Sequence, residues 1–148
     1  MLEGSVKVMK AVVLEKTCTA EELRISEIDI PTIKEEHVLV KINAFGINRS
    51  EILLRDYEAE EDYIKLPIVP GIECVGTVVE SSCEDFHVGD KIVSLMGGMG
   101  RSFNGSYEEY ALLPNKNVFK INQEIIDNLS LEEIASIPEI FHCIWFII

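Results

Sequence analysis

Short runs of β-branched and other apolar residues recur along most of this 148-residue chain, with turn-forming residues between them. The clearest run is HVLVKINAFGIN, residues 37–48, in which Val38, Val40 and Ile42 alternate with other side chains. Alternation with a period of two predicts a β-strand with one buried face. Further strands are expected within residues 6–16, 23–30, 71–81, 88–95, 106–114 and 117–121.

Helical patterns are few and short. Residues 48–57, NRSEILLRDY, have helical spacing, with Asn48 or Ser50 as the N-cap. Residues 130–137 begin with a capping box formed by Ser130 and Glu133. Because no strand–helix–strand repeat appears, the pattern predicts a mainly β domain with small helices. We expect a partly closed barrel and no parallel nucleotide-binding sheet.

The stretch LMGGMGRSFNGSYEEY, residues 95–110, contains four of the nine glycines. It is a poor match to phosphate-binding loops. The dinucleotide fingerprint lacks its third glycine, and the P-loop spacing of Gly100 and Gly105 is followed by Ser106 instead of lysine. Asn104 and Gly105 both tolerate positive φ, which is typical of a two-residue hairpin turn. The sequence therefore favours a glycine-rich bend and a hairpin over a phosphate site.

The charge balance limits the partners. The chain has 26 acidic and 13 basic residues and a net charge of −13, which argues against nucleic acid and anionic membranes as partners. We expect no membrane span and no signal peptide. The four cysteines, which lack a Cys-x-x-Cys pair, are expected to be free thiols in a cytoplasmic protein; they are Cys18, Cys74, Cys83 and Cys143.

Three groups of residues carry a resemblance to a known family. They are Gly46-x-Asn48, Pro70-Gly71-x-Glu73-x-x-Gly76 and Gly89-Asp90-x-Ile92-Val93. In this order they resemble the N-terminal, GroES-like catalytic domain of the medium-chain dehydrogenase/reductase superfamily, which includes alcohol dehydrogenases. The similarity is strongest to the zinc-free, quinone-reductase-like branch, and it extends from Met9 to Glu139.

This resemblance implies an irregular β-barrel, which we place at residues 1–139. In the family a Rossmann-type domain that binds NAD(P)H follows, and the active site lies between the two domains. The fingerprint of that cofactor domain is absent from this chain, as in a truncated product. Residues 140–148, IFHCIWFII, depart from the family and form an apolar tail that something should cover.

The resemblance also implies site residues. Zinc-dependent members place a ligand cysteine at the position of Asn48, a ligand histidine at Ile72, and a third ligand at or near Glu139. A catalytic zinc needs three protein ligands, so no metal site and no zinc are expected here. In the zinc-free branch an asparagine at position 48 contributes to the nicotinamide end of the cofactor pocket. A plain helix N-cap is the other interpretation of Asn48, and the two are compatible.

Two departures bear on the substrate and the cofactor. Many quinone-reductase-like members carry a tyrosine where this chain has Leu53, which puts a quinone substrate in question. The family also has threonines near the nicotinamide as the chain enters the cofactor domain, where this chain has Ile140 and Cys143. Cys143 is therefore the second candidate cofactor-binding residue, and no catalytic residue is assigned.

By resemblance, the chain is expected to be the catalytic-domain portion of a zinc-independent oxidoreductase. The enzyme would use NADPH to reduce quinones, enones or related carbonyl compounds, and this chain alone would be inactive. The alternative is a non-catalytic β-barrel that acts as an interaction module or is the remnant of a truncated gene. A homodimer is compatible with either interpretation.

Overall fold

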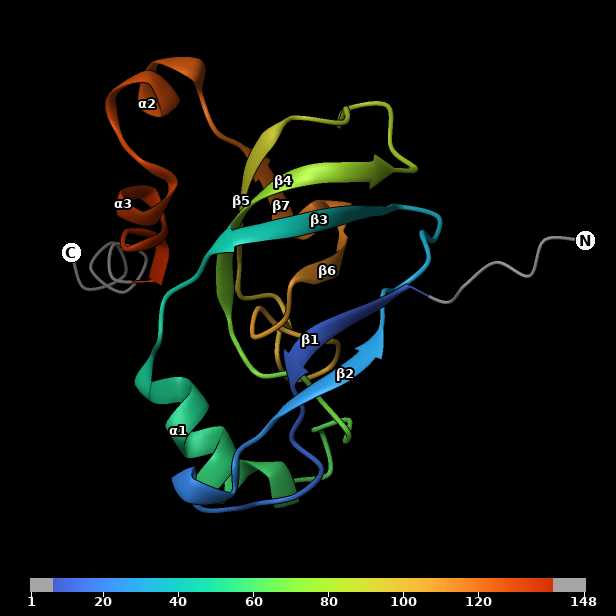
Figure 1. Cartoon of the computed structure of the whole chain (residues 1–148), viewed down its shortest axis with the longest axis vertical. Coiled ribbons are helices and arrows are strands. Elements are labelled where there is room, and N and C mark those ends of the chain that lie inside the picture. The colour runs from blue at the N-terminus through green and yellow to red at the C-terminus, as the bar shows by residue number, and fades with distance from the viewer. Residues whose placement is uncertain (1–6, 140–148) are drawn as a thin grey trace, which may run out of the picture.

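The computed structural model describes residues 7–139 (Figure 1). Seven strands lie in this part of the chain: β1 (Val8–Val12), β2 (Ile25–Asp29), β3 (His37–Ala44), β4 (Glu73–Ser81), β5 (Lys91–Leu95), β6 (Tyr110–Pro114) and β7 (Val118–Lys120). The helices are α1 (Arg49–Asp56), α2 (Gln123–Asn128) and α3 (Leu131–Ala135). Three single 3-10 turns complete the set: η1 (Ala20–Glu22), η2 (Glu58–Glu60) and η3 (Asn115–Asn117).

The strands form two antiparallel sheets. The larger has the order β6-β3-β4-β5-β7, and β1 pairs only with β2 in the smaller. The two sheets are joined where Ala11 of β1 bridges Glu108, just before β6, and where the N–H of Val12 donates to the carbonyl of Tyr107 at 2.8 Å. The result is a curled, barrel-like β domain (Figure 1), which confirms the predicted fold class.

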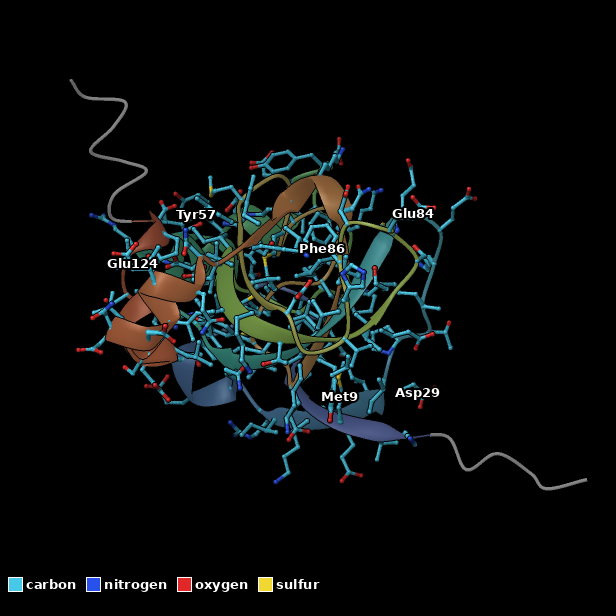
Figure 2. All side chains as sticks on the ribbon, turned by 90° about the horizontal axis from the view of Figure 1, so that it is seen from above. Met9, Asp29, Tyr57, Glu84, Phe86 and Glu124 are labelled. Atoms are coloured by element: carbon cyan, nitrogen blue, oxygen red, sulfur yellow. The ribbon has the colours of Figure 1, made fainter. Side chains whose placement is uncertain are left out.

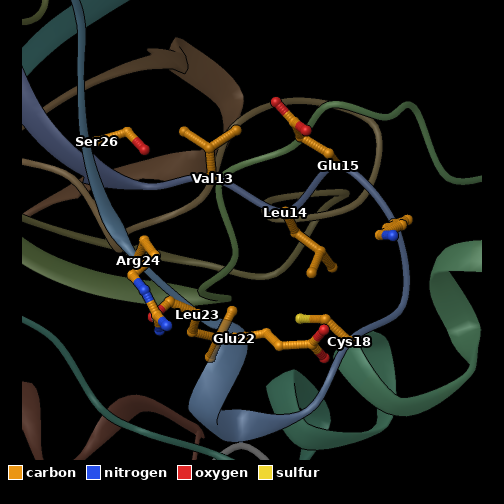
Figure 3. A pocket seen from close by; sticks show the side chains of 9 residues that line it. Val13, Leu14, Glu15, Cys18, Glu22, Leu23, Arg24 and Ser26 are labelled. Atoms are coloured by element: carbon orange, nitrogen blue, oxygen red, sulfur yellow. The ribbon is translucent and has the colours of Figure 1, made fainter.

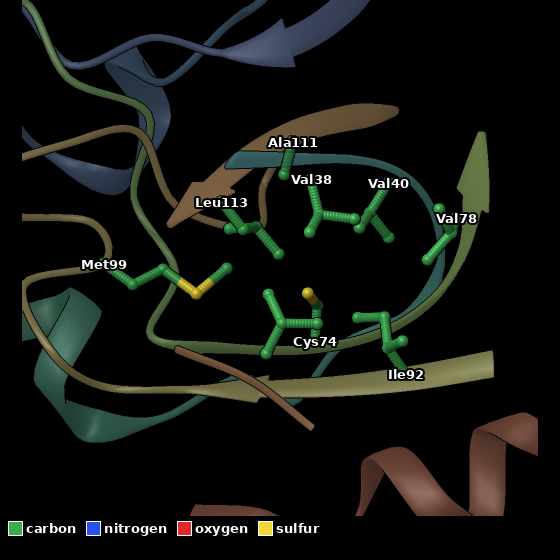
Figure 4. Close-up of a cluster of buried hydrophobic side chains, with 9 residues drawn as sticks. Val38, Val40, Cys74, Val78, Ile92, Met99, Ala111 and Leu113 are labelled. Carbon is green, nitrogen blue, oxygen red and sulfur yellow. The ribbon is translucent and has the colours of Figure 1, made fainter. Parts of the chain in front are cut away.

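The main core fills the inside of the curled sheet. Figure 4 shows apolar side chains of β3, β4, β5 and β6 pointing toward one another, with Met99 closing one side. Val38 and Val40, which the alternation placed on the inner face of β3, are fully buried. Figure 2 shows side chains filling this interior, whereas acidic side chains such as Glu84 and Glu124 lie on the outside.

Two smaller clusters position the helices. Leu54 of α1 packs with Leu14, Ala59, Ile64 and Ile68, and this cluster holds α1 against the segment that follows β1. On the outer face of β4, Val75 packs with Ile134 and Ala135 of α3. The expected capping box starts α3, since the N–H of Glu133 donates to the Ser130 hydroxyl and the Ser130 N–H donates to the Glu133 carboxylate. The helix α2 was not predicted.

The expected hairpin at Asn104 and Gly105 is wrong. Strands β5 and β6 are not neighbours in the sheet, so the segment between them crosses the end of the barrel instead of reversing in a turn. Positive φ values occur earlier, at Met96, Gly97, Gly98 and Gly100, and Gly105 has none. Gly105 instead permits close packing, because a Cβ there would collide with the carbonyl oxygens of Pro70 and Gly71.

The glycine-rich segment is nevertheless a structural bend, as expected. Its backbone N–H groups are used within the protein: Gly100 donates to the carbonyl of Phe103 at 2.9 Å, and Gly105 donates to the carbonyl of Val69 at 2.7 Å. These donors are therefore not aimed at a phosphate. Within residues 7–139, no helix has the length and apolar character needed to cross a membrane. The tail, residues 140–148, lies outside the described residues, so its boundary at 139 stays a prediction.

Candidate functional site around Asn48

Asn48 lies at the junction between β3 and α1. It is the N-cap of α1: its backbone N–H donates to Oε2 of Glu51 at 2.7 Å, and its carbonyl accepts from the N–H of Glu51 at 3.2 Å. An acidic side chain at the third helical position reaches back in this way in a capping box. The N-cap interpretation of Asn48 is therefore confirmed, and Ser50 lies inside the helix.

The side chain of Asn48 is held by a buried carboxylate. Its Nδ2 donates to Oε1 of Glu73, the first residue of β4, at 2.8 Å. The backbone N–H of Glu139 donates to the other oxygen, Oε2, at 2.8 Å. Glu73 is 3% exposed and lies against Gly46, where a Cβ would collide with its carboxylate. Residues 48, 73 and 139, far apart in sequence, thus meet at one place.

The residues at this place do not form a set of zinc ligands. Ile72 is buried and aliphatic, Asn48 presents an amide, and both carboxylate oxygens of Glu73 already accept hydrogen bonds. A catalytic zinc takes three histidine, cysteine or carboxylate ligands. Among residues 7–139, no group of three such side chains could hold a metal ion.

Glu51, in the first turn of α1, is a candidate site residue that the sequence pattern does not reveal. Its side chain is 6% exposed, and its Oε1 has no hydrogen-bond partner in the described part of the chain. Burial raises the pKa of Glu51; the backbone hydrogen bonds and the Arg101 charge oppose this shift, and the Glu73 charge reinforces it. The three-residue spacing from Asn48 to Glu51 could predict the capping box, but it could not predict that the Glu51 side chain is buried.

A cavity of about 200 Å³ opens beside these groups. Most of its wall is apolar. The polar side chains that line it are Asn48, Glu51, Arg55 and Tyr107. The other lining residues are Val12, Leu14, Leu23, Ile47, Ile52 and Pro70. Burial raises the pKa of Tyr107 to about 12, and the charge of Glu51 adds to the shift. The cavity can therefore hold part of a small, largely apolar molecule, with a polar end of that molecule at Asn48 and Glu51.

A larger cavity, of about 430 Å³, lies between the end of β1 and η1 (Figure 3). Two of its polar side chains, Glu22 and Arg24, serve local structure. The carboxylate of Glu22 accepts the N–H of Thr19 at 2.7 Å, and the guanidinium of Arg24 donates to the Leu23 carbonyl at 2.8 Å. We therefore do not assign this cavity a function.

The three cysteines in the described part of the chain do not add a site. Cys18, Cys74 and Cys83 are free thiols, as expected, and burial raises the pKa of Cys74 to about 12, where a thiol is inert as a nucleophile. Cys143, the second candidate cofactor-binding residue, lies outside the described residues.

Residues 34–123 match the family described as the alcohol dehydrogenase GroES-like domain. This match covers more than half of the chain, which therefore belongs to that family and has its GroES-like fold. The expected resemblance is confirmed.

Individual relatives point to the same superfamily. The chain is 29% identical over 122 residues to human quinone oxidoreductase, covering 80% of this chain and 35% of the relative. It is 33% identical to an alcohol dehydrogenase of Geobacillus stearothermophilus, covering 87% and 43%. It is 27% identical to the mouse protein named synaptic vesicle membrane protein VAT-1 homolog-like, covering 91% of this chain and 30% of the relative. The chain thus spans between 30% and 43% of the length of these relatives.

Solved structures share the fold. The human VAT-1 homolog-like protein has a TM-score of 0.79 at 24% identity, with 96% of this chain and 43% of that chain covered. The quinone oxidoreductase from Coxiella burnetii has a TM-score of 0.76 at 22% identity, with 90% and 42% covered. At this level of identity, the similarity supports the barrel fold of the chain and nothing finer.

Proposed function

We propose that this chain is the catalytic-domain portion of a zinc-independent, NAD(P)H-dependent oxidoreductase, whose substrates are quinones, enones or related carbonyl compounds. One observation carries the proposal. At the place where zinc-dependent relatives are expected to hold a metal, Asn48 and the backbone of Glu139 instead clamp the carboxylate of Glu73. An apolar cavity adjoins this clamp, as a site for an uncharged carbonyl compound requires.

The nicotinamide, when bound, supplies the hydride. The contribution of this chain is to position the nicotinamide and the substrate and to exclude water from the site. The amide of Asn48 is fixed by Glu73 and by the start of α1, so it can hydrogen-bond to a flat polar ring without reordering. Apolar side chains such as Ile47 and Pro70 shield the neighbouring space. We propose Asn48, and by resemblance Cys143, as the residues of this chain nearest the nicotinamide.

The proposal includes inactivity of this chain by itself. Dinucleotide pyrophosphates are held at the N-terminus of a helix after a glycine-rich turn in a strand–helix–strand unit. Residues 7–139 contain no such unit, and all their strand pairs are antiparallel. The contacts that would dominate NADPH binding therefore lie outside the described barrel. A cytoplasmic location fits a small-molecule reductase and belongs to the same proposal.

The test is a nuclear magnetic resonance titration of the 148-residue chain, labelled with nitrogen-15, with NADPH at concentrations up to about 10 mM, because binding through Asn48 alone is expected to be weaker than about 1 mM. We expect the side-chain amide signal of Asn48 to move, while that of Asn43, which is exposed on β3, stays in place. ADP, which lacks the nicotinamide, should leave Asn48 unchanged. Movement of Asn48 with both ligands, or with neither, would contradict the proposal.

The alternative, a non-catalytic interaction module, is supported by exposed apolar side chains. Ile47 and Ile25 are 78% and 72% exposed, and a homodimer or another protein is the kind of partner that such surfaces contact. Sedimentation equilibrium distinguishes this alternative. A stable dimer with no NADPH effect on Asn48 would favour the module over the enzyme.

A further inference from the structure

A second hollow adjoins the cavity at Asn48. This hollow, which we call the Phe45 hollow, has a volume of about 340 Å³. The apolar part of its lining consists of Ala11, Val12, Ile25, Phe45, Ile47 and Tyr107. Three of these residues, Val12, Ile47 and Tyr107, also line the cavity at Asn48, so the two hollows adjoin along one apolar wall.

The wall that the two hollows share is preformed. The rings of Phe45 and Tyr107 pack with centroids 4.8 Å apart, tilted by 31°. The backbone of Tyr107 is fixed on both sides, because its N–H donates to the carbonyl of Pro70 at 3.0 Å and its carbonyl accepts from the N–H of Val12 at 2.8 Å. A ligand that lies along this wall therefore meets side chains that are already in place.

The charged residues of the Phe45 hollow leave its apolar wall available. The carboxylate of Glu109 accepts the backbone N–H of Lys10 at 2.7 Å, and the exposed Lys10 can keep its ammonium in water. Glu108 is 6% exposed, and burial raises its pKa to about 8, so its carboxyl is mostly uncharged at neutral pH. The net charge of −13 disfavours an anion here, so an uncharged hydrocarbon chain is the chemistry that fits.

The cavity at Asn48 is suited to the polar end of such a molecule. Glu51 lines it, is 6% exposed, and has an Oε1 without a hydrogen-bond partner among residues 7–139. A buried polar atom of this kind calls for a partner, which a bound ligand can supply. Burial raises the pKa of Glu51, and a protonated carboxyl can donate a hydrogen bond to a carbonyl oxygen.

The two hollows together have the size of a ligand site. The cavity at Asn48, of about 200 Å³, lies below the roughly 300–1,000 Å³ of small-molecule sites, whereas both hollows together fall within that range. We propose that the substrate is a carbonyl compound with an extended, uncharged hydrocarbon chain. Its carbonyl group binds beside Asn48 and Glu51, and its chain runs past Ile47 into the Phe45 hollow. This inference rests on the proposed function, because it takes the cavity at Asn48 as the site of the carbonyl group.

A series of straight-chain methyl ketones, from 2-butanone to 2-octanone, tests this on the 148-residue chain without NADPH. The side-chain amide signal of Asn48 and the methyl signals of Ile25 follow binding by nuclear magnetic resonance. Each added methylene should tighten binding about two- to threefold, and the whole series by more than about tenfold, because an open hollow gives part of the gain of full burial. The Ile25 methyl signals should respond to 2-octanone and not to 2-butanone.

Ile25→Ser separates the chain from the carbonyl end, because Ile25 lines the Phe45 hollow and not the cavity at Asn48. This variant should bind 2-octanone severalfold more weakly and 2-butanone as the parent does. Since Ile25 is 72% exposed, the barrel should keep its far-ultraviolet circular dichroism. The matched control is Ile125→Ser on α2, where the isoleucine is 44% exposed and both ketones should bind as in the parent.

Three results would overturn the inference. If Asn48 responds to every ketone with the same affinity, the chain does not enter the Phe45 hollow, and the proposed function is untouched. If Ile125→Ser weakens 2-octanone as much as Ile25→Ser does, the chain binds elsewhere. If no ketone moves the Asn48 signal, the carbonyl group does not bind there, and the NADPH titration decides separately whether Asn48 lies at the nicotinamide.

Discussion

At the scale of single residues, Asn48 has two structural partners that fix it completely. Its backbone starts α1 through Glu51, and its side chain is tied to Glu73. An N-cap alone explains the first contact but not the second, since capping needs no partner on β4. This second contact is what makes Asn48 a candidate for holding a flat ligand in one orientation.

The first prediction concerns metal content. Because an amide at Asn48 and an aliphatic side chain at Ile72 replace zinc ligands, we expect less than stoichiometric zinc in protein purified without a metal-binding tag. Elemental analysis measures this directly. The double variant Asn48→Cys with Ile72→His serves as the comparison, and it should retain more zinc than the parent. One tightly held zinc per parent chain would refute the zinc-free assignment.

The second prediction concerns Glu108, which faces the core. It is 6% exposed, neither carboxylate oxygen has a hydrogen-bond partner in the described part of the chain, and burial raises its pKa to about 8. Between about pH 4.5 and pH 8, Glu108 therefore keeps its proton in the folded state, whereas in the unfolded chain, where its pKa is about 4.5, it has released that proton. The free energy of unfolding should fall as the pH rises through this interval, and the loss should be complete above about pH 8.

Glu108→Gln tests this, because it keeps the size of the side chain and removes the ionisation. Urea unfolding should show a flatter pH dependence and a variant that is more stable than the parent by a few kcal/mol near pH 9, by linkage. The control is Glu84→Gln on the exposed surface, which should follow the parent. Parallel profiles for Glu108→Gln and the parent would show that Glu108 does not titrate in this way.

At the scale of elements, the glycine-rich connection from β5 to β6 depends on close backbone contact at Gly105. The third prediction separates this from a hairpin turn, in which asparagine is well tolerated because it accepts positive φ. We expect both Gly105→Asn and Gly105→Ala to destabilise the protein by about 1–3 kcal/mol, since any Cβ overpacks the contact. Thermal or urea unfolding measures the loss.

Gly89 provides the matched position, because it has a positive φ of 97° and open space around it. There, Gly89→Asn should be tolerated better than Gly105→Asn. Tolerance of asparagine at 105 together with damage from alanine would restore the hairpin interpretation.

The strands could be predicted from the sequence because each has local signals. The alternation of Val38 and Val40 and the β-branched run of β4 depend only on neighbours in the chain. The order of the strands could not, since β5 and β6 are close in sequence but separated in the sheet by β3 and β4. Local sequence signals therefore favour a hairpin turn at Asn104 and Gly105, which the strand order excludes.

The candidate site was predictable only in part, for the same reason. The resemblance brought positions 48, 72 and 139 to attention, but the clamp on Glu73 joins segments 25 and 66 residues apart. The burial of Glu51 is likewise a property of the packed barrel. The helix α2 has only two apolar residues, which are adjacent, among four polar ones. It therefore lacks the apolar periodicity that predicts α1.

At the scale of the whole molecule, the chain matches 35% of the length of human quinone oxidoreductase and 43% of a bacterial alcohol dehydrogenase. In the proposed function, the barrel supplies Asn48 and an apolar wall to the site, but residues 7–139 contain no element suited to binding a pyrophosphate. Its net charge of −13 also repels the phosphates of NADPH. We therefore propose that this chain supplies one side of a cofactor site.

Calorimetric titration of the 148-residue chain with NADPH tests this claim most directly. The few contacts available near Asn48 should leave the dissociation constant weaker than about 1 mM, which corresponds to only about 4 kcal/mol of binding free energy. The same sample should show no NADPH oxidation above background with a small quinone. A dissociation constant in the micromolar range would contradict the account, because it would require a complete dinucleotide site within this chain or between two copies of it.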